Sequence, residues 1–467
     1  MIRATERRDS THAALHCREA AMEHNATMCE ETISAPRHLR IALVHNSPGG
    51  GAKRAVRLLA EGLLKNGHTI EVFVPSTAEE QYLPLRELGI PVHVFPIALR
   101  PRALNIRPFL LERVLEVAQL CWFASAHKRL ARRMARAIDH GGYDVVWVDK
   151  CEAFGSPFVL RYLHTPTVFY CHDPRRDDEE WRLKPDEAKA APSFAPRRWY
   201  AGLCAMTERW ERRLRLHLDR EHARCATRIV TNSLHTQSHL RRAYDRVALV
   251  SYLGIRSEVF APLGLPREPL AVLVGRFSVL KRHHLAVRAI GQLPKAIRPR
   301  LVIVAEPCTN RIARSLRAQT ERLAEQLDVQ LEIVEGLSDQ QLVELYNRAI
   351  VVLYTAVREP FGLVALEAMA CGTPVVAVRE GGLQESVIDG QTGVLVDPTP
   401  EACARAIERI AQDRRLQERL GAGGVEMVRR SWTWSAAVER FERHLADVAN
   451  GRAASIEEPC SLTREQR

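Results

Sequence analysis

Two glutamates and a short turn form the most informative group of polar residues in the sequence. Glu359 and Glu367 are separated by seven residues, and the turn Pro360–Gly362 lies between them. The apolar residues after this turn predict a helix, whose first backbone N–H groups have no partner within the helix. Those groups belong to Gly362, Leu363 and Val364. Free N–H groups and the helix dipole both favour a phosphate, so the segment predicts a site for a phosphorylated ligand.

Two cations stand at the end of another predicted strand. Gly275 and Arg276 end the apolar run that begins at Leu270, and Lys281 follows five residues after Arg276. Fixed cations and oriented N–H groups can stabilise negative charge that develops on a bound ligand. No metal is needed for this, and the chain contains no D-x-D motif. Ordinary surface charge is the alternative interpretation of both cations.

Further candidates follow predicted strands in the N-terminal half. His172 lies near the end of an apolar run that begins at Pro166, where a histidine either meets a ligand or makes structural hydrogen bonds. The glycine loop Gly49–Gly51 lets a ligand approach the backbone closely, and Gly50 and Gly51 are candidate contacts. The loop lacks a G-x-G-x-x-G motif, so by itself it indicates little.

The elements that must hold these residues alternate between strands and helices. In the N-terminal half, the apolar run Leu39–Asn46 predicts a strand, and an apolar stripe over about Ala52–Asn66 predicts a helix after the glycine loop. Three more apolar runs are typical of buried parallel strands: Tyr143–Asp149, Pro166–Asp173 and Thr227–Ser233. This half is therefore predicted to be a doubly wound α/β domain.

A second series of the same kind begins after residues 255–268, where prolines and glycines interrupt regular structure. We place the domain boundary there. The predicted strands include Leu270–Arg276, Arg300–Glu306 and Leu331–Gly336, and the predicted helices include Asp339–Arg348 and Leu363–Cys371. Two doubly wound domains in one chain predict a cleft between them, with a ligand at the carboxyl ends of the strands.

The segment with the two glutamates resembles a known signature. Residues 359–377 read E-P-F-G-x-x-x-x-E-A-M-A-x-G-x-P-V-V-A, which resembles the donor site of retaining GT-B glycosyltransferases of family four. The resemblance covers nearly all of the chain after residue 37. It includes the glycine loop, Tyr170–Pro174, Thr231–Ser233, Gly275 with Arg276 and Lys281, and Gly381–Gly382 with Glu385. A plain strand-to-helix turn would use the last two glycines as well.

The resemblance implies the GT-B fold, which has two Rossmann-like domains and an interdomain cleft. Residues 38–260 would form the acceptor-side domain and residues 261–428 the nucleotide-sugar donor domain. Residues 429–450 would form a helix that crosses back to the first domain. Residues 1–37 and 451–467 are expected to be flexible extensions.

The resemblance also implies roles for the candidate residues. Glu359 would accept hydrogen bonds from the donor sugar, Glu367 would hold the nucleotide ribose, and His172 would contact the sugar. The residues expected to act in catalysis are His172, Glu359, Arg276 and Lys281. The residues expected to bind the donor are Gly50, Gly51, Gly275, Phe361, Gly362, Leu363, Val364 and Glu367. A nucleotide diphosphate sugar is the expected co-substrate, and neither a cofactor nor a metal is expected.

The donor and the acceptor stay open at this stage. Tyr170–Pro174 resembles a segment of some mannosyltransferases that act on lipid-linked acceptors, which gives GDP-mannose a small preference over a UDP-sugar. Glu306–Cys308 replaces a turn that is usually rich in glycine in this family, so contacts to the base can differ. The acceptor is expected to be a glycan or a lipid-linked molecule. Two alternatives remain, namely a sugar-nucleotide epimerase or phosphorylase of the same fold, and a binding protein without transferase activity.

The charge of the chain bears on its partners. Lysine and arginine (67) outnumber aspartate and glutamate (56), and the net charge is +11. Basic helical runs occur within Val114–Ile138 and Arg197–Arg224, and the first places Leu115, Ala118, Trp122 and Leu130 near one apolar side. Such faces suit an anionic membrane surface or are simply solvated, and no nucleic-acid motif is present, so nucleic acid is not expected as a partner.

Other features bear on location. The chain has 11 cysteines but no C-x-x-C motif, which favours reduced thiols. No apolar signal segment precedes Arg40, and no stretch is long and apolar enough to span a bilayer. We therefore expect a cytoplasmic protein, with peripheral attachment to the inner face of the membrane left open.

Overall fold

The structure is a computed structural model. It describes residues 38–46, 49–78, 82–97, 109–151, 154–174 and 195–452. The side chains of residues 109–119 and 195–205 are outside this description. The expected extension at residues 1–37 and most of the expected tail therefore lie outside the described residues. The described residues from Leu39 to Arg452 belong to one compact unit.

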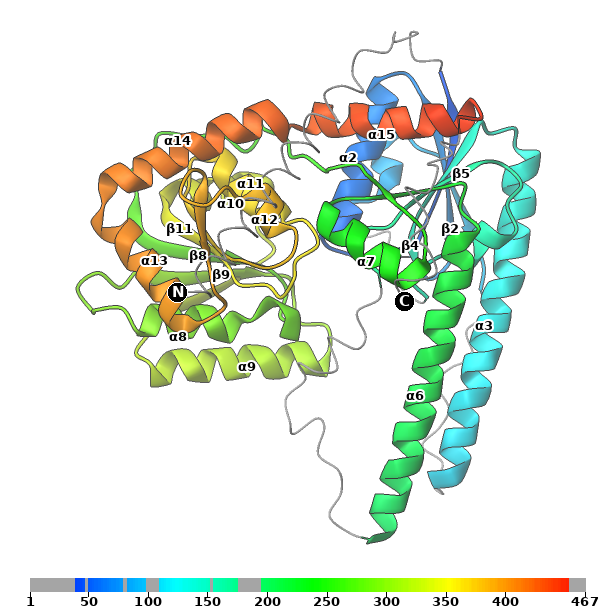
Figure 1. Cartoon of the computed structure of the whole chain (residues 1–467), viewed down its shortest axis with the longest axis horizontal. Coiled ribbons are helices and arrows are strands. Elements are labelled where there is room, and N and C mark those ends of the chain that lie inside the picture. Colours follow the sequence, from blue (N-terminus) through cyan, green and yellow to red (C-terminus); the bar gives the residue numbers. More distant parts are fainter. Residues whose placement is uncertain are drawn as a thin grey trace, which may run out of the picture. The chain divides into compact units, whose positions relative to one another are not determined.

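The N-terminal half contains a parallel sheet with seven described strands (Figure 1). The strands are β1 (Arg40–Asn46), β2 (Thr69–Pro75), β3 (Val92–Phe95), β4 (Val145–Cys151), β5 (Thr167–Tyr170), β6 (Arg228–Thr231) and β7 (Leu249–Val250). Their order is β3-β2-β1-β4-β5-β6-β7. Leu43 of β1 pairs with Val72 on one side and with Trp147 on the other. The central strands are apolar throughout because both faces of the sheet are covered.

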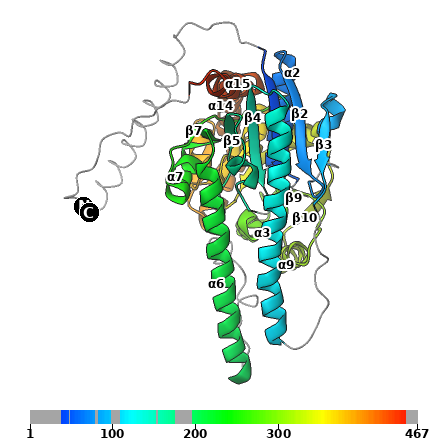
Figure 2. The same cartoon turned by 90° about the vertical axis from the view of Figure 1, so that its right-hand side faces the viewer.

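The helices of this half divide between the two faces of the sheet. They are α2 (Gly51–Lys65), α3 (Phe109–His140), α6 (Ala195–Arg224) and α7 (Leu234–Tyr244), with short 3₁₀ turns at Leu85–Leu88 and Phe158–Arg161. Leu43 points into the core shared with α2, whereas Val44 points into the core shared with α3. The long helices α3 and α6 pack against each other, and their N-terminal ends extend beyond the strands in both views (Figures 1 and 2).

The C-terminal half repeats the architecture with six described parallel strands in the order β10-β9-β8-β11-β12-β13. The strands are β8 (Glu268–Val274), β9 (Arg300–Ala305), β10 (Leu331–Glu335), β11 (Ala349–Tyr354), β12 (Val375–Val378) and β13 (Gly393–Val396). The helices are α8 (His283–Gly291), α9 (Arg311–Gln326), α10 (Asp339–Arg348), α11 (Leu363–Ala370), α12 (Leu383–Ser386), α13 (Pro400–Gln412), α14 (Arg414–Ser431) and α15 (Trp434–Ala449), and a 3₁₀ turn spans Val279–Lys281. The predicted α/β class, with two doubly wound sheets, is confirmed.

The last helix, α15, packs on the N-terminal sheet and not on the sheet that precedes it in the chain (Figure 1). Phe441 of α15 contacts Trp147 and Tyr170 with ring centroids 4.8 and 5.3 Å apart. The Oε1 atom of Glu442 lies 2.9 Å from Nε2 of His68, a residue in the turn that joins α2 to β2. Helix α15 thus connects the second half of the fold to the first.

The two sheets separate within a short interval. The first sheet ends at Val250 and the second begins at Glu268. Within this interval Ile255 pairs with Thr433, just before α15. The domain boundary predicted from the prolines and glycines lies in this interval and stays a prediction.

The close packing of α15 on α2 gives a stability test. A Cβ atom at Gly62 of α2 would lie 2.3 Å from Val438 Cγ2 of α15. Gly62→Ala should therefore lower the free energy of unfolding by about 1–3 kcal/mol, as overpacked cores do. In a Val438→Ala background the clashing methyl groups are absent, so the same change should cost much less. Urea unfolding of the two pairs of variants measures this difference, and an equal cost in both backgrounds would contradict the packing.

Candidate functional site

The first part of the site is an ion pair at the carboxyl ends of β8 and β11. Lys281 ends the 3₁₀ turn after β8, and its Nζ donates to Glu359 Oε2 at 2.9 Å. Both side chains are about one-fifth exposed, at 22% and 20%. A Cβ atom at Gly275 would lie 3.2 Å from Lys281 Cδ, so glycine leaves room for the lysine stem. Strand order reverses between β8 and β11, the place where open α/β sheets bind ligands.

The second predicted cation is placed differently. Arg276 is exposed, and no hydrogen bond or ion pair joins its side chain to the described residues. It follows Gly275 directly, so it lies at the end of the strand that leads to Lys281. Its position is compatible with binding an anion, but the structure does not join it to the Lys281–Glu359 pair.

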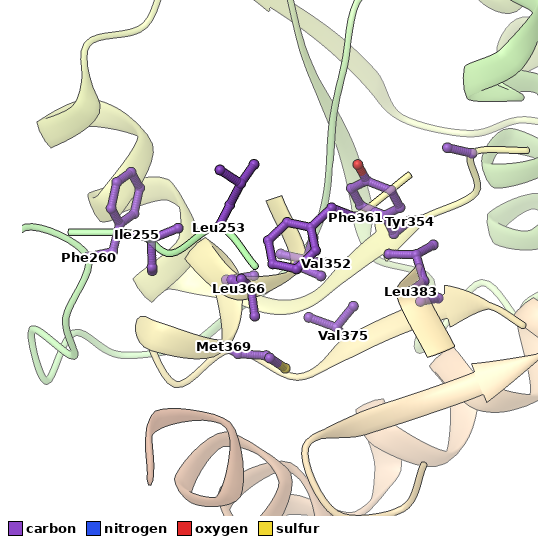
Figure 3. Close-up of a cluster of buried hydrophobic side chains, with 14 of the residues drawn as sticks. Leu253, Ile255, Phe260, Val352, Tyr354, Phe361, Leu366, Met369, Val375 and Leu383 are labelled. Carbon is purple, nitrogen blue, oxygen red and sulfur yellow. The ribbon is translucent and has the colours of Figure 1, made fainter. Parts of the chain in front are cut away.

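The turn after Glu359 starts α11 at the same edge of the sheet. Gly362 precedes the helix with φ 99°, a left-handed conformation that favours glycine. Leu363 and Val364 follow at the helix start, where backbone N–H groups have no partner within the helix. Phe361 is 2% exposed and packs against Tyr252 and Trp432, so only its backbone can face a ligand. Figure 3 shows it inside the apolar cluster and not at its edge.

Glu367, on the buried side of α11, has two partners of different origin. Its Oε1 accepts from Arg54 Nη1 at 3.1 Å, and its Oε2 accepts from the Tyr346 hydroxyl at 3.3 Å. Arg54 belongs to α2 of the N-terminal half and also pairs with Asp339, the first residue of α10. Burial raises the pKa of Glu367, while the charge of Arg54 opposes that rise. The sequence predicted Glu367 as a site residue but missed Arg54 and Asp339.

His172 is buried beside a second carboxylate. Its Nε2 lies 3.0 Å from Asp149 Oδ2 at the end of β4, and its ring stacks on Tyr170 at 4.5 Å. Asn232 Nδ2 donates to its backbone carbonyl at 3.0 Å. These contacts fix the ring with Nε2 toward Asp149, which leaves Nδ1 as the ring nitrogen for a ligand. A structural histidine would have the same contacts, so the role of His172 stays a prediction.

The glycine loop of the first half faces the second half. Gly50 has φ 110° and precedes α2, which begins at Gly51. A Cβ atom at Gly50 would lie 3.7 Å from Glu306 Oε1, a residue that follows β9. Glu306 is also where the sequence departs from the family pattern, so the departure lies opposite the loop.

Glu385 was predicted beside the donor, and the structure turns it toward the N-terminal half. Its carboxylate accepts from the backbone N–H groups of Leu234 and His235 at 2.9 and 2.8 Å, at the start of α7. The Tyr252 hydroxyl donates to it at 2.9 Å. A carboxylate at a helix N-terminus is favoured by the helix dipole. Leu234 and Glu385 are 151 residues apart, and no local pattern indicates that they meet.

The glycines before Glu385 shape the turn that carries Glu359. The Gly382 N–H donates to the Glu359 carbonyl at 2.7 Å. A Cβ atom at Gly381 would lie 2.4 Å from that same carbonyl oxygen, and one at Gly382 would lie 2.2 Å from the Pro360 carbonyl oxygen. These glycines therefore act on the site through the backbone, by letting two loops lie against each other.

The described residues bear on metal binding and on membrane insertion. No group of three or more histidine, cysteine, aspartate or glutamate side chains is arranged there to hold a metal ion. Within the same ranges, no helix has the length and apolar character needed to cross a bilayer. The expectation of metal-independent chemistry stays a prediction.

Comparisons with known proteins agree with this geometry. The family model "Glycosyl transferase 4-like domain" matches residues 50–253, and "Glycosyl transferases group 1" matches residues 256–427. The D-inositol 3-phosphate glycosyltransferase of Stackebrandtia nassauensis is 28% identical, over 90% of this chain and 94% of its own. The enzyme of the same name from Acidothermus cellulolyticus is 37% identical, over 46% of this chain and 52% of its own.

Solved structures show the same fold. Sucrose-phosphate synthase from Thermosynechococcus elongatus superposes with a TM-score of 0.66 at 22% identity, over 89% of this chain and 100% of that one. HepE of Anabaena, solved with UDP and glucose, superposes with a TM-score of 0.64 at 19% identity, over 88% and 100% of the two chains.

The two parallel sheets and the likeness to these structures define the GT-B fold. The chain belongs to glycosyltransferase family four, the glycosyl transferases group 1, and is a glycosyltransferase. The family predicted from the glutamate segment is thereby confirmed.

The contact of Gly381 with the Glu359 turn predicts a loss of activity without direct contact to substrate. Gly381→Ala must displace that turn, and a misplacement of about 1 Å can cost roughly 10²-fold in rate. Gly390 is a matched control, because its φ of 72° resembles the 65° of Gly381 while a Cβ atom there would meet nothing within 4 Å. Both variants should lose about 1–2 kcal/mol of stability from backbone strain. Only Gly381→Ala should lower kcat/KM for the donor, and equal activities would contradict the argument.

Proposed function

We propose that this glycosyltransferase transfers a hexose from a nucleotide diphosphate sugar to an acceptor hydroxyl, with retention of configuration and without a metal. The observation that carries the proposal is the Lys281–Glu359 pair next to the start of α11, with Glu367 on the same helix. A cation, free helix N–H groups and two carboxylates match the parts of such a donor. The diphosphate needs positive charge, and the hydroxyls of the sugar and the ribose need acceptors.

In the proposed reaction, the bond between the sugar and the β-phosphate breaks while the acceptor oxygen bonds to the same carbon on the same face. The departing phosphate oxygen takes the proton of the acceptor hydroxyl, so no protein nucleophile is required. Lys281, with Arg276 and the N–H groups of Leu363 and Val364, stabilises the negative charge on the diphosphate. Glu359 orients the sugar, and Glu367 binds the ribose.

The choice of nucleotide rests on a solved structure and on a sequence segment, whereas the choice of acceptor rests on the names of relatives. HepE, a protein of the same fold, was solved with UDP and with UDP-glucose, which favours a UDP-sugar. The Tyr170–Pro174 segment favours GDP-mannose instead, so both donors belong in the first assay. Several relatives are named D-inositol 3-phosphate glycosyltransferases, which makes this phosphorylated polyol the first acceptor to test. Lipid-linked and glycan acceptors complete the panel.

Substitutions in the ion pair test the proposed site. Lys281→Ala and Glu359→Gln should each lower kcat/KM for the donor by about 10²–10³-fold in the presence of EDTA, because each removes a preorganised charge from the transition state. Lys295 is a matched control, since it also pairs with a carboxylate of this half, Asp328, at 2.6 Å, but on the exposed surface. Lys295→Ala should keep wild-type turnover.

Three outcomes of this assay would contradict the proposal. Wild-type turnover in either site variant would remove the donor-site assignment. Loss of all activity in EDTA, with recovery in manganese, would contradict metal-independent transfer. Epimerisation of the donor without transfer to any acceptor would favour the epimerase alternative.

Attachment to an anionic membrane is a finer proposal, and the burial of the side chains leads us to assign it to α6 and not to α3. On α3, Leu130 is buried in the core of its own domain, so the predicted apolar side is not free at that position. Arg133 donates to the Pro96 carbonyl at 2.6 Å, and Arg132 lies over the Tyr162 ring. The described part of α3 is therefore a packed helix with arginines on its outer face.

Helix α6 has the better surface for a membrane. Met206, Trp210 and Leu216 are 61%, 45% and 39% exposed. Arg209 and Arg213 are exposed beside them. At 3.6 residues per turn these five positions fall on one side of the helix. Apolar side chains with flanking arginines and no intervening acid on that side suit an interface with anionic lipid.

A vesicle assay tests this surface. The wild type should bind vesicles that contain anionic lipid and should dissociate as salt rises, because charge attraction is screened over about 10 Å at 0.1 M salt. Trp210→Ser with Arg213→Gln should abolish binding while donor hydrolysis in solution is kept. Replacing Arg129, Arg132, Arg133 and Arg136 of α3 with glutamine is the comparison and should weaken binding far less. Equal binding to neutral vesicles, or none, would contradict the proposal.

A further inference from the structure

Arg54 joins the two halves of the enzyme at the carboxylate proposed to bind the ribose. It lies on α2, one turn after the glycine loop, and its side chain is 21% exposed. One end of its guanidinium donates to Glu367, and the other donates to Asp339. Arg256, from the segment between the sheets, approaches Asp339 at 3.5 Å. Two cations and two carboxylates thus alternate across the boundary between the halves.

These contacts leave part of the acceptor capacity of Glu367 unused. A carboxylate offers about four acceptor positions. Arg54 uses one on Oε1, and the Tyr346 hydroxyl uses one on Oε2, so each oxygen keeps one position. Glu367 also lines a small pocket together with Leu363, Arg54 and Asp339. Arg54 and Tyr346 therefore hold the carboxylate in place without using all of its acceptor positions.

The charges around Glu367 have opposite effects on its pKa. Among the described residues, the charged or titratable groups that interact with Glu367 include Arg54 from α2, Asp339 and Tyr346 from α10, Tyr354 from β11, Cys371 at the end of α11, and Tyr82 from the loop after β2. Arg256 lines the same pocket. Burial raises the pKa of Glu367, Arg54 lowers it, and Asp339 raises it. Burial lowers the pKa of Arg54, but both carboxylates outweigh that effect and raise it above its usual value. Arg54 is therefore the cation that opposes protonation of Glu367.

We propose that Arg54 is a positioning residue that keeps Glu367 ionised and oriented for the ribose diol of the donor. The N-terminal half thereby contributes to nucleotide recognition through a residue of the C-terminal half. This inference rests on the proposed role of Glu367 in binding the ribose.

The sign of the pH effect follows from these charges. An ionised carboxylate accepts hydrogen bonds from both ribose hydroxyls, whereas a protonated one has lost acceptor capacity. Arg54→Gln removes the cation, so the pKa of Glu367 rises and recognition of the diol is lost at a higher pH than in the wild type. Asp339→Asn removes the opposing negative charge, so the double variant should regain part of the lost range. Arg54→Lys keeps the charge and should lie between wild type and Arg54→Gln.

The experiment compares binding of UDP and GDP with that of their 2′,3′-dideoxy analogues, by calorimetry on the full chain from pH 5 to 8.5. The ratio of the two affinities isolates the diol, because titration of the phosphates affects both ligands alike. The wild type should prefer the ribonucleotide by about 10–100-fold, the range for a hydrogen bond to a charged group. In Arg54→Gln this preference should fall about tenfold for each pH unit below the raised pKa.

Arg57→Gln is the matched control, because Arg57 lies on the same helix and pairs with Glu87 at 3.1 Å. Its ratio should follow the wild-type curve. Two results would overturn the role of Arg54. In the first, the affinity ratio of Arg54→Gln equals that of the wild type at every pH. In the second, the ratio is lower by the same factor at every pH, and the double variant does not restore it. Failure of the proposed function gives a different result, since Glu367→Gln would then keep the wild-type preference for the ribonucleotide.

Discussion

The burial of one carboxylate imposes the strongest constraint on this structure. Glu367 is 3% exposed, and a charge removed from water is costly unless it is paired and hydrogen-bonded. One partner, Tyr346, comes from the same half of the chain, but the cation comes from α2 of the other half. The charge at the proposed ribose site is therefore balanced only when both halves are assembled around it.

Other contacts between the halves converge on the same region. Glu385 accepts hydrogen bonds from the start of α7, and Ser233 Oγ donates to the Pro360 carbonyl at 2.5 Å. The second contact ends on the turn that carries Glu359. Helix α15 adds an apolar tie, because Phe441 packs between rings of the first sheet. The turn that carries Glu359 is thus held by both halves.

The Lys281–Glu359 pair has a simpler origin than the contacts of Glu367. Both residues follow neighbouring strands of one sheet, so parallel strand order alone brings them to the same edge. Their partial exposure leaves them accessible to a ligand. A donor that binds there meets a lysine and a carboxylate already oriented toward each other, which reduces the rearrangement required at the reaction step.

The sequence by itself determined the α/β class, the two sheets and the family, and it predicted the segment proposed to bind the donor. These features follow from local patterns, since apolar runs predict buried strands, glycines mark the turns, and the spacing of Glu359 and Glu367 is set by one turn and one helix. Only the tertiary structure decided the partners of the buried charges. Arg54 meets a residue 313 positions away, and Glu385 caps a helix of the opposite half. It also decided that Phe361 belongs to the core and that α3 is packed on its own domain with its arginines on the outer face. Such contacts depend on how the two halves of the fold meet, which no local pattern encodes.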